Sequence, residues 1–510
     1  METNLNNIFR KLFKGGGIIF LGYILDLSIS FFAKVAIARV LGPVNYGNVY
    51  LGITVLTLAT TLCLLGFQNG IARYLPRFEK DADKLGVFLS ATYIAVPLSI
   101  IVAAGIVVSA PIIAELAFQN SDIAPYLRVF GLVVPFAVVI KLAVGSIQGL
   151  HLATPRVVIE NIAPSISRMA FVAIAILLGA KTLGLALAYA LAYIVTGFIG
   201  AYYLYRYMPK LTRVSPNMKY RELAIFSLPL IVSGAVSFLL NDLDTLMLGY
   251  YKDSFSVGIY NVIYPIAQVV MIFLSSFGFL FMPIISGFDA EGLNDKIKRI
   301  YQTITKWVFL FTVPILFVIV VFPDLTIRYT FGVEYLVGST TLIALSIAFF
   351  SHAVTGPNSG ILTAIGETNL IMWDNIFVAL INALLNILLI PRYGFFGAGV
   401  ATAISYAILN ILFSGQVYLR TGFHPFSTRF IQVGVVSLVF IGIMLWLIER
   451  YLLSNIQTAL GTIVVFLGIY SVIILRWGIE EQEVALLNSF EERFNINLKS
   501  IKKELERFVR

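Results

Sequence analysis

Long apolar runs constrain this chain more than any other feature of its sequence. Fourteen of them follow one another, separated by short polar segments or by Gly and Pro breaks. About 20 helical residues, each rising about 1.5 Å, cross the roughly 30 Å hydrocarbon layer of a bilayer. The runs are 16–39, 45–67, 86–110, 126–150, 154–179, 182–206, 222–250, 255–285, 300–323, 336–361, 367–390, 396–419, 429–449 and 457–476. We therefore expect an all-α, polytopic membrane protein with 14 transmembrane helices.

Composition and charge agree with a membrane protein. Hydrophobic residues make up 59% of the 510 residues and charged residues only 12%, more apolar surface than a soluble chain could bury. The net charge of +9 comes mostly from short loops and the tail, which is the positive-inside pattern and not a nucleic-acid-binding stripe. It predicts a multi-pass protein of the cell membrane with both termini cytoplasmic. The lone Cys63 excludes an intrachain disulfide.

An internal repeat divides the chain. Corresponding positions are Gly47 and Gly258, Gly66 and Gly278, Gly149 and Gly360, Glu160-Asn161 and Asp374-Asn375, and Tyr193 and Tyr406. The offset stays between about 211 and 214 residues, and an even number of spans separates the copies, so they run parallel in the membrane. We expect two pseudo-symmetric six-helix lobes around a cavity, residues 1–210 and 211–421. Two extra helices (422–477) and an amphipathic cytoplasmic tail (478–510) follow.

Acidic residues interrupt the seventh run. A carboxylate at the bilayer centre costs about 2.5–3.5 kcal/mol on translocon scales, so such residues need a partner or a function. On a continuous helix, Ser233, Ser237, Asn241, Asp244 and Thr245 share one stripe. This pattern predicts Asp244 on a wet or paired face and Asp242 off it.

The rear half also supplies neutral oxygen ligands. Asn382 and Asn386 lie one helical turn apart in the eleventh run, and Thr402 follows in the twelfth. With Asp244 they offer hard oxygen atoms suited to a small cation, so we expect H⁺ or Na⁺ as the coupling ion. Further candidates for the cation-coupling set are Asp242 and Asp26. The alternative is that these polar groups only hydrogen-bond between helices.

The front half carries buried cations instead. Lys34, Lys141 and Arg168 lie inside apolar runs, and Arg39 and Arg128 lie near run ends. A guanidinium fork and an ammonium group suit a phosphate, which predicts a phosphate-bearing substrate in the cavity. The alternative is that Lys34 reaches the membrane interface and that Arg168 pairs with Glu160 or with an acid across the cavity.

Enzymatic motifs are missing from the sequence. His151, His352 and His424 lack metalloprotease spacing, and the chain has no Walker loop and no nucleophile elbow. Asp242-Leu243-Asp244 spells a D-x-D motif, but on a helix the two carboxylates point about 200° apart. We expect a non-enzyme without cofactor or resident metal, and without a nucleic-acid partner.

Two segments of the front half carry a family resemblance, ARVLGPVNYGNVYLG (residues 38–52) and LGFQNGIARYLPRF (residues 65–78). DTLMLGYYKDSFSVGIYN (residues 244–261) and NALLNILLIPRYGFFGAGVATA (residues 382–403) extend it into the second half. The chain resembles polysaccharide exporters, the lipid-linked oligosaccharide flippases of the multidrug/oligosaccharidyl-lipid/polysaccharide (MOP) superfamily. The resemblance implies two lobes in a V, two extra helices, and alternating access that carries a polyprenyl-(di)phosphate glycan outward.

The resemblance also implies where sites lie and which kinds of residue form them. Lipid II flippases place cavity cations in the first lobe and a cation site among helices seven, eleven and twelve. This sequence has fewer first-lobe arginines than such a flippase. A polysaccharide polymerase or glycosyltransferases are candidate partners, and we expect a monomer. Two other functions stay open: a multidrug and toxin extrusion (MATE) antiporter, whose cationic drugs would prefer acids in the cavity, and a non-transporting scaffold for glycan assembly.

Overall fold

The protein is helical throughout the part of the chain that the structure describes. The structure is a computed structural model that describes residues 2–210, 212, 214–451, 456–474 and 476, with no strand among them. Eleven of these helices are long and apolar enough to cross a membrane, or twelve if a bent pair counts as one span. The polytopic all-α prediction is confirmed, whereas the count of 14 stays a prediction. The tail at 478–510 lies outside the described residues.

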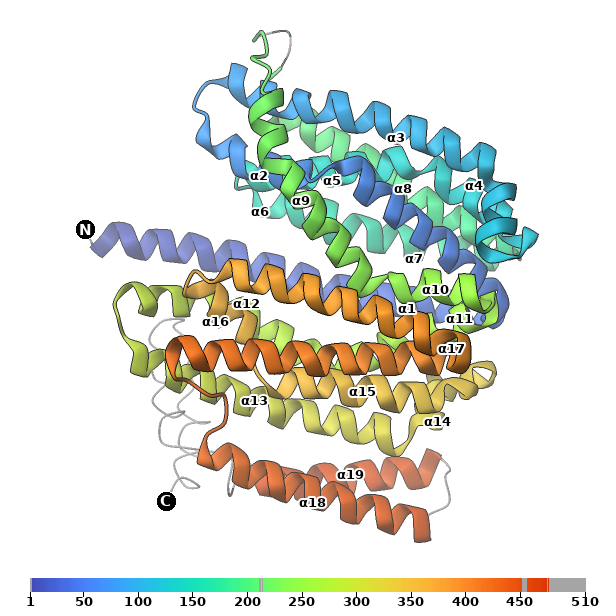
Figure 1. Ribbon diagram of the computed structural model, residues 1–510, viewed down its shortest axis with the longest axis vertical. Helices are drawn as coiled ribbons and strands as arrows, with labels where there is room; N and C mark the ends of the chain where they lie inside the picture. Colours follow the sequence, from blue (N-terminus) through green and yellow to red (C-terminus); the bar gives the residue numbers. More distant parts are fainter. Residues whose placement is uncertain (1, 211, 213, 452–455, 475, 477–510) are drawn as a thin grey trace. The chain divides into compact units, whose positions relative to one another are not determined.

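In the first half, the first two predicted runs form two helical segments of α1 that are separated by a sharp kink. The helices are α1 (Glu2–Leu64), α2 (Phe67–Tyr74), α3 (Asp81–Phe118), α4 (Ala124–Leu132), α5 (Val134–Gly149), α6 (Ala153–Val157), a π-helical turn (Val158–Ile162), α7 (Ala163–Leu177) and α8 (Thr182–Tyr207) (Figure 1). The kink in α1 lies at Gly42, whose φ of 69° is accessible to glycine without the Cβ clash that other residues meet. Pro43 follows directly and cannot donate a helical hydrogen bond.

In the second half, the seventh predicted run is broken into two helices. The helices are α9 (Tyr220–Asn241), α10 (Leu243–Tyr251), α11 (Ser254–Gln268), α12 (Ile272–Ala290), α13 (Asn294–Val321), α14 (Pro323–Thr330), α15 (Ser339–Val354), α16 (Asn358–Ala364), α17 (Thr368–Thr421), α18 (Thr428–Tyr451) and α19 (Ile456–Ile473). The break between α9 and α10 lies at Asp242. α17 holds the eleventh and twelfth runs, with a kink at Gly394 (φ 57°).

The helices group into two compact units. The first comprises the described residues within 1–262, 331–338 and 379–398, and the second those within 263–330, 339–378 and 399–510. The unit boundaries cross α11 and α17. The lobe boundary that we predict near residue 210 remains a prediction.

Glycines bring two helices of the first unit into backbone contact. A Cβ added at Gly47 of α1 would overlap the backbone of Ser254, and one at Gly258 of α11 would overlap the backbone of Pro43. Small residues allow such close helix packing in membranes. Gly47 and Gly258 are equivalent positions of the sequence repeat, so equivalent points of the two copies meet here.

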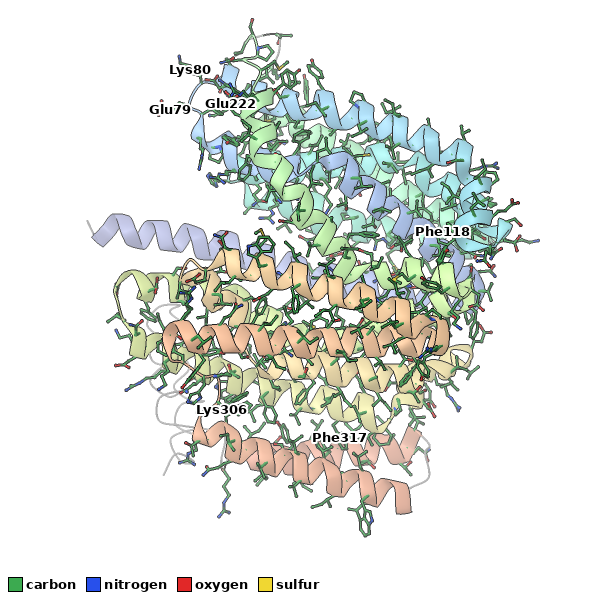
Figure 2. The ribbon with its side chains drawn as sticks, in the orientation of Figure 1. Glu79, Lys80, Phe118, Glu222, Lys306 and Phe317 are labelled. Atoms are coloured by element: carbon green, nitrogen blue, oxygen red, sulfur yellow. The ribbon has the colours of Figure 1, made fainter. Side chains whose placement is uncertain are left out.

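Aromatic stacking joins the last two helices to α13 in the second unit. The rings of Phe317 (α13) and Phe466 (α19) stack with centroids 3.7 Å apart, and Phe317 is labelled in Figure 2. The Tyr470 hydroxyl donates to the Leu310 carbonyl over 3.0 Å. On α18, Phe430 packs edge-on against Phe309. The thirteenth and fourteenth predicted runs therefore form helices that pack on α13.

Candidate functional site

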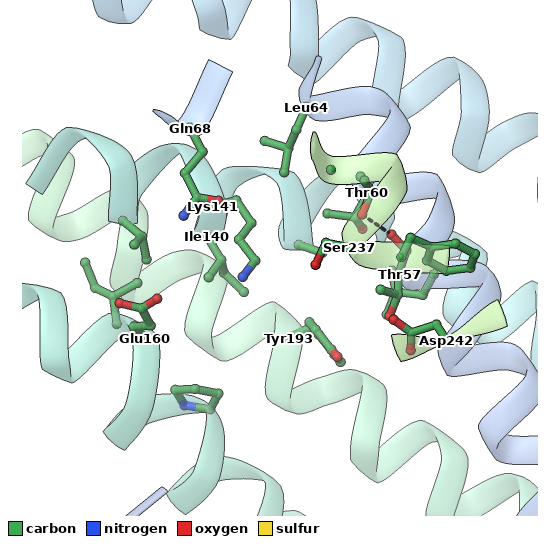
Figure 3. Close-up of a pocket in the computed structure, with 18 of the residues that line it drawn as sticks. Thr57, Thr60, Leu64, Gln68, Ile140, Lys141, Glu160, Tyr193, Ser237 and Asp242 are labelled. Carbon is green, nitrogen blue, oxygen red and sulfur yellow. Dashed lines mark hydrogen bonds between the residues drawn. The ribbon is translucent and has the colours of Figure 1, made fainter. Parts of the chain in front are cut away.

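The first compact unit contains a cavity of about 750 Å³. Its polar lining comes from α1, α2, α5, α7, α8, α9 and the π-helical turn, and Figure 3 shows Lys141 projecting into the space between Glu160 and Asp242. The polar and charged lining residues are Asp26, Ser30, Lys34, Thr57, Thr60, Thr61, Gln68, Asn69, Lys141, Glu160, Arg168, Tyr193, Ser233, Ser237 and Asp242. Lys34, Lys141 and Arg168, predicted as substrate-binding cations, thus come together with three acids.

The three cations of this cavity are not neutralised by ion pairs. Among the described residues, no carboxylate lies within 4.0 Å of the charged groups of Lys34, Lys141 or Arg168. The Arg168 guanidinium lies 4.5 Å from the centre of the Tyr189 ring, and its buried Nε has no hydrogen-bond partner within the described part of the chain. The Lys34 Nζ lies 6.0 Å from the Tyr50 ring. Their positive charge is available to an anion.

Two of the three acids are already engaged. Arg156 Nε donates to Glu160 over 2.9 Å, so the alternative in which Glu160 neutralises Arg168 is wrong. Glu160 lies in the π-helical turn just before Pro164, whose missing N–H disfavours a regular α-helix there. Asp26 also lines the cavity. Its carboxylate accepts hydrogen bonds from Ser30 (2.9 Å) and Ser165.

Asp242 lies at a position that the sequence pattern did not predict. Its φ and ψ of −124° and −14° end α9, so the continuous helix assumed for the polar stripe does not exist. The break turns Asp242 into the cavity beside Ser233 and Ser237, and the prediction that Asp242 lies off the polar face is wrong. Its carboxylate accepts no hydrogen bond from any residue that the structure describes.

Asp244, by contrast, is buried in a hydrogen-bonded cluster. Only 4% of it is exposed. The Tyr260 hydroxyl donates to Oδ2 over 2.5 Å, and Asn386 Nδ2 donates to Oδ1 over 2.5 Å and to Asn382 Oδ1 over 3.0 Å. Asn386 Oδ1 is buried with no hydrogen-bond partner in the described residues. Asp244 Oδ1 and Asn382 Oδ1 thus converge on the amide group of Asn386. Carboxylate and amide oxygens are ligands suited to a small hard cation.

The remaining predicted residues lie elsewhere. Arg39 and Arg128 are exposed and do not line the cavity. Thr402 is buried in the second compact unit. Sequence reasoning missed Tyr193 and Tyr260 as site residues, although Tyr193 recurs in the repeat as Tyr406 and Tyr260 lies within the segment that carries the family resemblance.

Two family models and three curated proteins match the chain. The model described as "Polysaccharide biosynthesis protein" matches residues 12–288, and the one described as MatE matches residues 229–388. The chain is 24% identical over 246 residues to the probable low-salt glycan biosynthesis flippase Agl15 of Haloferax volcanii. That match covers 46% of this chain and 51% of the flippase, so it spans about half the length of that relative.

Solved structures share the fold. The lipid II flippase MurJ, in an inward closed conformation, matches with a TM-score of 0.71 at 15% identity, over 90% of this chain and 99% of that one. An inward-facing MATE family transporter of the MOP superfamily matches with a TM-score of 0.64 at 15% identity, over 78% and 98%. At these identities the likeness shows the fold alone. Since the first family model covers more than half of the 510 residues, the chain belongs to the polysaccharide biosynthesis protein family of the MOP superfamily.

Proposed function

We propose that this protein is a flippase that moves a polyprenyl-(di)phosphate-linked oligosaccharide from the cytoplasmic to the outer leaflet. The observation that carries the proposal is the set of three cations, Lys34, Lys141 and Arg168, that line one cavity without ion pairs among the described residues. Inside a membrane, such cations must face water, protein or a bound anion. A diphosphate supplies that anion, and Arg168 can bind it through a forked pair of hydrogen bonds.

The proposal includes alternating access by two six-helix lobes within a 14-helix protein. Support comes from the repeat and from the meeting of Gly47 with α11 and of Gly258 with α1, because equivalent positions contact each other only near a pseudo-twofold axis. Surface polysaccharide or glycoprotein glycan assembly would use the product in the outer leaflet. A polymerase or glycosyltransferases would be its partners.

Transport would be coupled to Na⁺ or H⁺ at the Asp244 cluster. Asp244, Asn382 and Asn386 offer oxygen atoms in one buried place, and the unpartnered Asn386 Oδ1 is a ligand that a cation would engage. Occupation of the cluster would favour one conformation through its differential affinity for the two.

A MATE-type antiporter of cationic drugs is the second candidate. It is favoured by the MatE match over residues 229–388 and by the acids Asp26, Glu160 and Asp242 in the cavity. Of these acids, Glu160 is paired with Arg156, whereas the Ser30 hydroxyl that donates to Asp26 leaves the charge of that carboxylate in place. The three cations of the cavity still outnumber Asp26 and Asp242. The resulting positive balance disfavours a cationic substrate. A non-transporting scaffold would leave the unneutralised cations without a role.

Deleting the gene in its own organism tests the proposal. We expect a surface polysaccharide or glycan to disappear while its lipid-linked precursor accumulates, and wild-type protein to restore both. Unchanged surface glycans together with a new sensitivity to cationic drugs would instead support the antiporter.

A further inference from the structure

The second compact unit contains a cavity of its own, of about 340 Å³. It lies between the α12 region and the α15–α16 segment and is lined by Met271, Leu274, Ser275, Gly278, His352, Gly356, Pro357, Asn358, Ser359, Gly360 and Thr363. No Asp, Glu, Lys or Arg is among these described lining residues. Its volume falls at the lower end of the range of about 300–1,000 Å³ for small-molecule sites.

This second cavity corresponds to the first through the sequence repeat. Gly149 matches Gly360 at an offset of 211 residues, and the same offset carries Lys141 of the first cavity onto His352 of the second. Both residues line their cavities from equivalent helices, α5 and α15. The duplicated position therefore holds a lysine in one copy and a histidine in the other.

Hydrogen bonds fix the orientation of this imidazole. The Nδ1 atom of His352 lies 2.6 Å from Asn410 Oδ1, and Asn410 Nδ2 donates to Ser351 Oγ over 3.2 Å. An amide oxygen only accepts, so Nδ1 carries a proton. In the neutral ring Nε2 is then an acceptor, and it has no hydrogen-bond partner among the described residues. The cavity wall thus offers one oriented acceptor to a hydroxyl donor.

The rest of the wall is uncharged and combines polar side chains with the apolar side chains of Met271, Leu274 and Pro357. Asn358 is fixed between Tyr301, whose hydroxyl donates to it, and Ser414, to which it donates over 2.8 Å. The Thr363 hydroxyl donates to the Ser359 carbonyl over 2.7 Å and keeps its own oxygen as an acceptor. A wall without charged groups offers an ionised ligand no compensation for its lost hydration, whereas neutral hydroxyls can be satisfied.

We propose that this second cavity binds neutral sugar units, with His352 Nε2 accepting a hydrogen bond from a sugar hydroxyl. The inference rests on the proposed function for the origin of the sugar, the glycan of the lipid-linked substrate. The second cavity is then a recognition site for hydroxyl groups, whereas the cationic cavity recognises phosphate.

Photo-crosslinking tests the inference directly. Purified full-length protein in nanodiscs is labelled with a diazirine-tagged maltotriose and, separately, with the same trisaccharide joined to farnesyl diphosphate. Mass spectrometry then locates the modified peptides. We expect labelling within residues 271–278 and 352–363 by at least the lipid-linked probe. A probe that labels only other segments would overturn the inference.

Variants separate recognition from folding. His352→Phe should lower labelling roughly three- to tenfold, as loss of one hydrogen bond predicts, whereas His352→Gln keeps an acceptor and should retain most of it. Thr363→Val, similar in shape, should lower labelling about twofold. Lys141→Ala is the reciprocal variant: it should weaken capture of sugar-free farnesyl diphosphate but leave maltotriose labelling unchanged. Wild-type labelling in both His352→Phe and Thr363→Val would contradict the inference. Because sugar labelling does not require transport, it can fail or succeed independently of flipping.

Discussion

Replacement of Arg168 by alanine gives the sharpest test of the cationic cavity. A hydrogen bond to a charged group contributes about 1.5–3 kcal/mol, so loss of a forked pair to a diphosphate should cost at least about 3 kcal/mol. Since about 1.4 kcal/mol corresponds to a tenfold change, the Kd should rise about 100-fold. The free protein loses only the contact with the Tyr189 ring, on the order of 1 kcal/mol, because Arg168 forms no ion pair with a described carboxylate.

The assay is a titration of nanodisc-embedded protein with fluorescent farnesyl diphosphate, accompanied by thermal unfolding. Arg168→Lys keeps the charge but loses the fork, so its affinity should fall between wild type and Arg168→Ala. Arg128→Ala is the matched control, because Arg128 is exposed and does not line the cavity. Wild-type affinity for the probe in Arg168→Ala would refute the reasoning. If that protein also unfolds far more easily, the result would assign Arg168 a structural role.

Three further predictions concern the ion cluster, the helix contact and the cavity acid. Asn386→Leu removes a hydrogen-bond donor to Asp244. It should lower the free energy of unfolding by about 1–3 kcal/mol and abolish stabilisation of the protein by Na⁺. Unchanged Na⁺-dependent melting would argue against a cation site. Gly47→Ala should prevent stable folding because its Cβ meets backbone, whereas Gly105→Ala has nothing within 4 Å and should express normally; equal yields in detergent would contradict the packing account. Asp242→Asn removes an unneutralised acid from the cavity and should tighten farnesyl diphosphate binding roughly three- to tenfold. Weaker binding would show instead that the carboxylate helps to hold the substrate.

The sequence predicted the helical framework well, because the bilayer requires long apolar segments with internally satisfied backbones. The predicted runs on either side of Gly42 and of Gly394 are separate helical segments that meet at these glycines, both of which have positive φ. Whether a chain turns back or continues at such a glycine depends on φ and on packing, which hydropathy does not report.

The candidate site was predictable in its charges but not in its pairings. Lys34, Lys141 and Arg168 were found because cations are costly in lipid. The partner of Glu160 is Arg156, four residues earlier, a local pair that a cavity-centred interpretation overlooked. Asp242 was assigned to the wrong face because a helix break at one residue changes the direction of the side chains that follow. The sequence directly around Asp242 contains no proline or glycine that would indicate such a break.

Transbilayer movement of a lipid-linked glycan is the measurement that tests the account most directly. Purified protein is reconstituted in liposomes with a fluorescent polyprenyl-diphosphate oligosaccharide, and an impermeant quencher reports the fraction exposed outside. We expect protein-dependent movement that Arg168→Ala abolishes and Arg128→Ala preserves. Absence of movement with wild-type protein, together with uptake of a cationic drug by the same liposomes, would contradict the account.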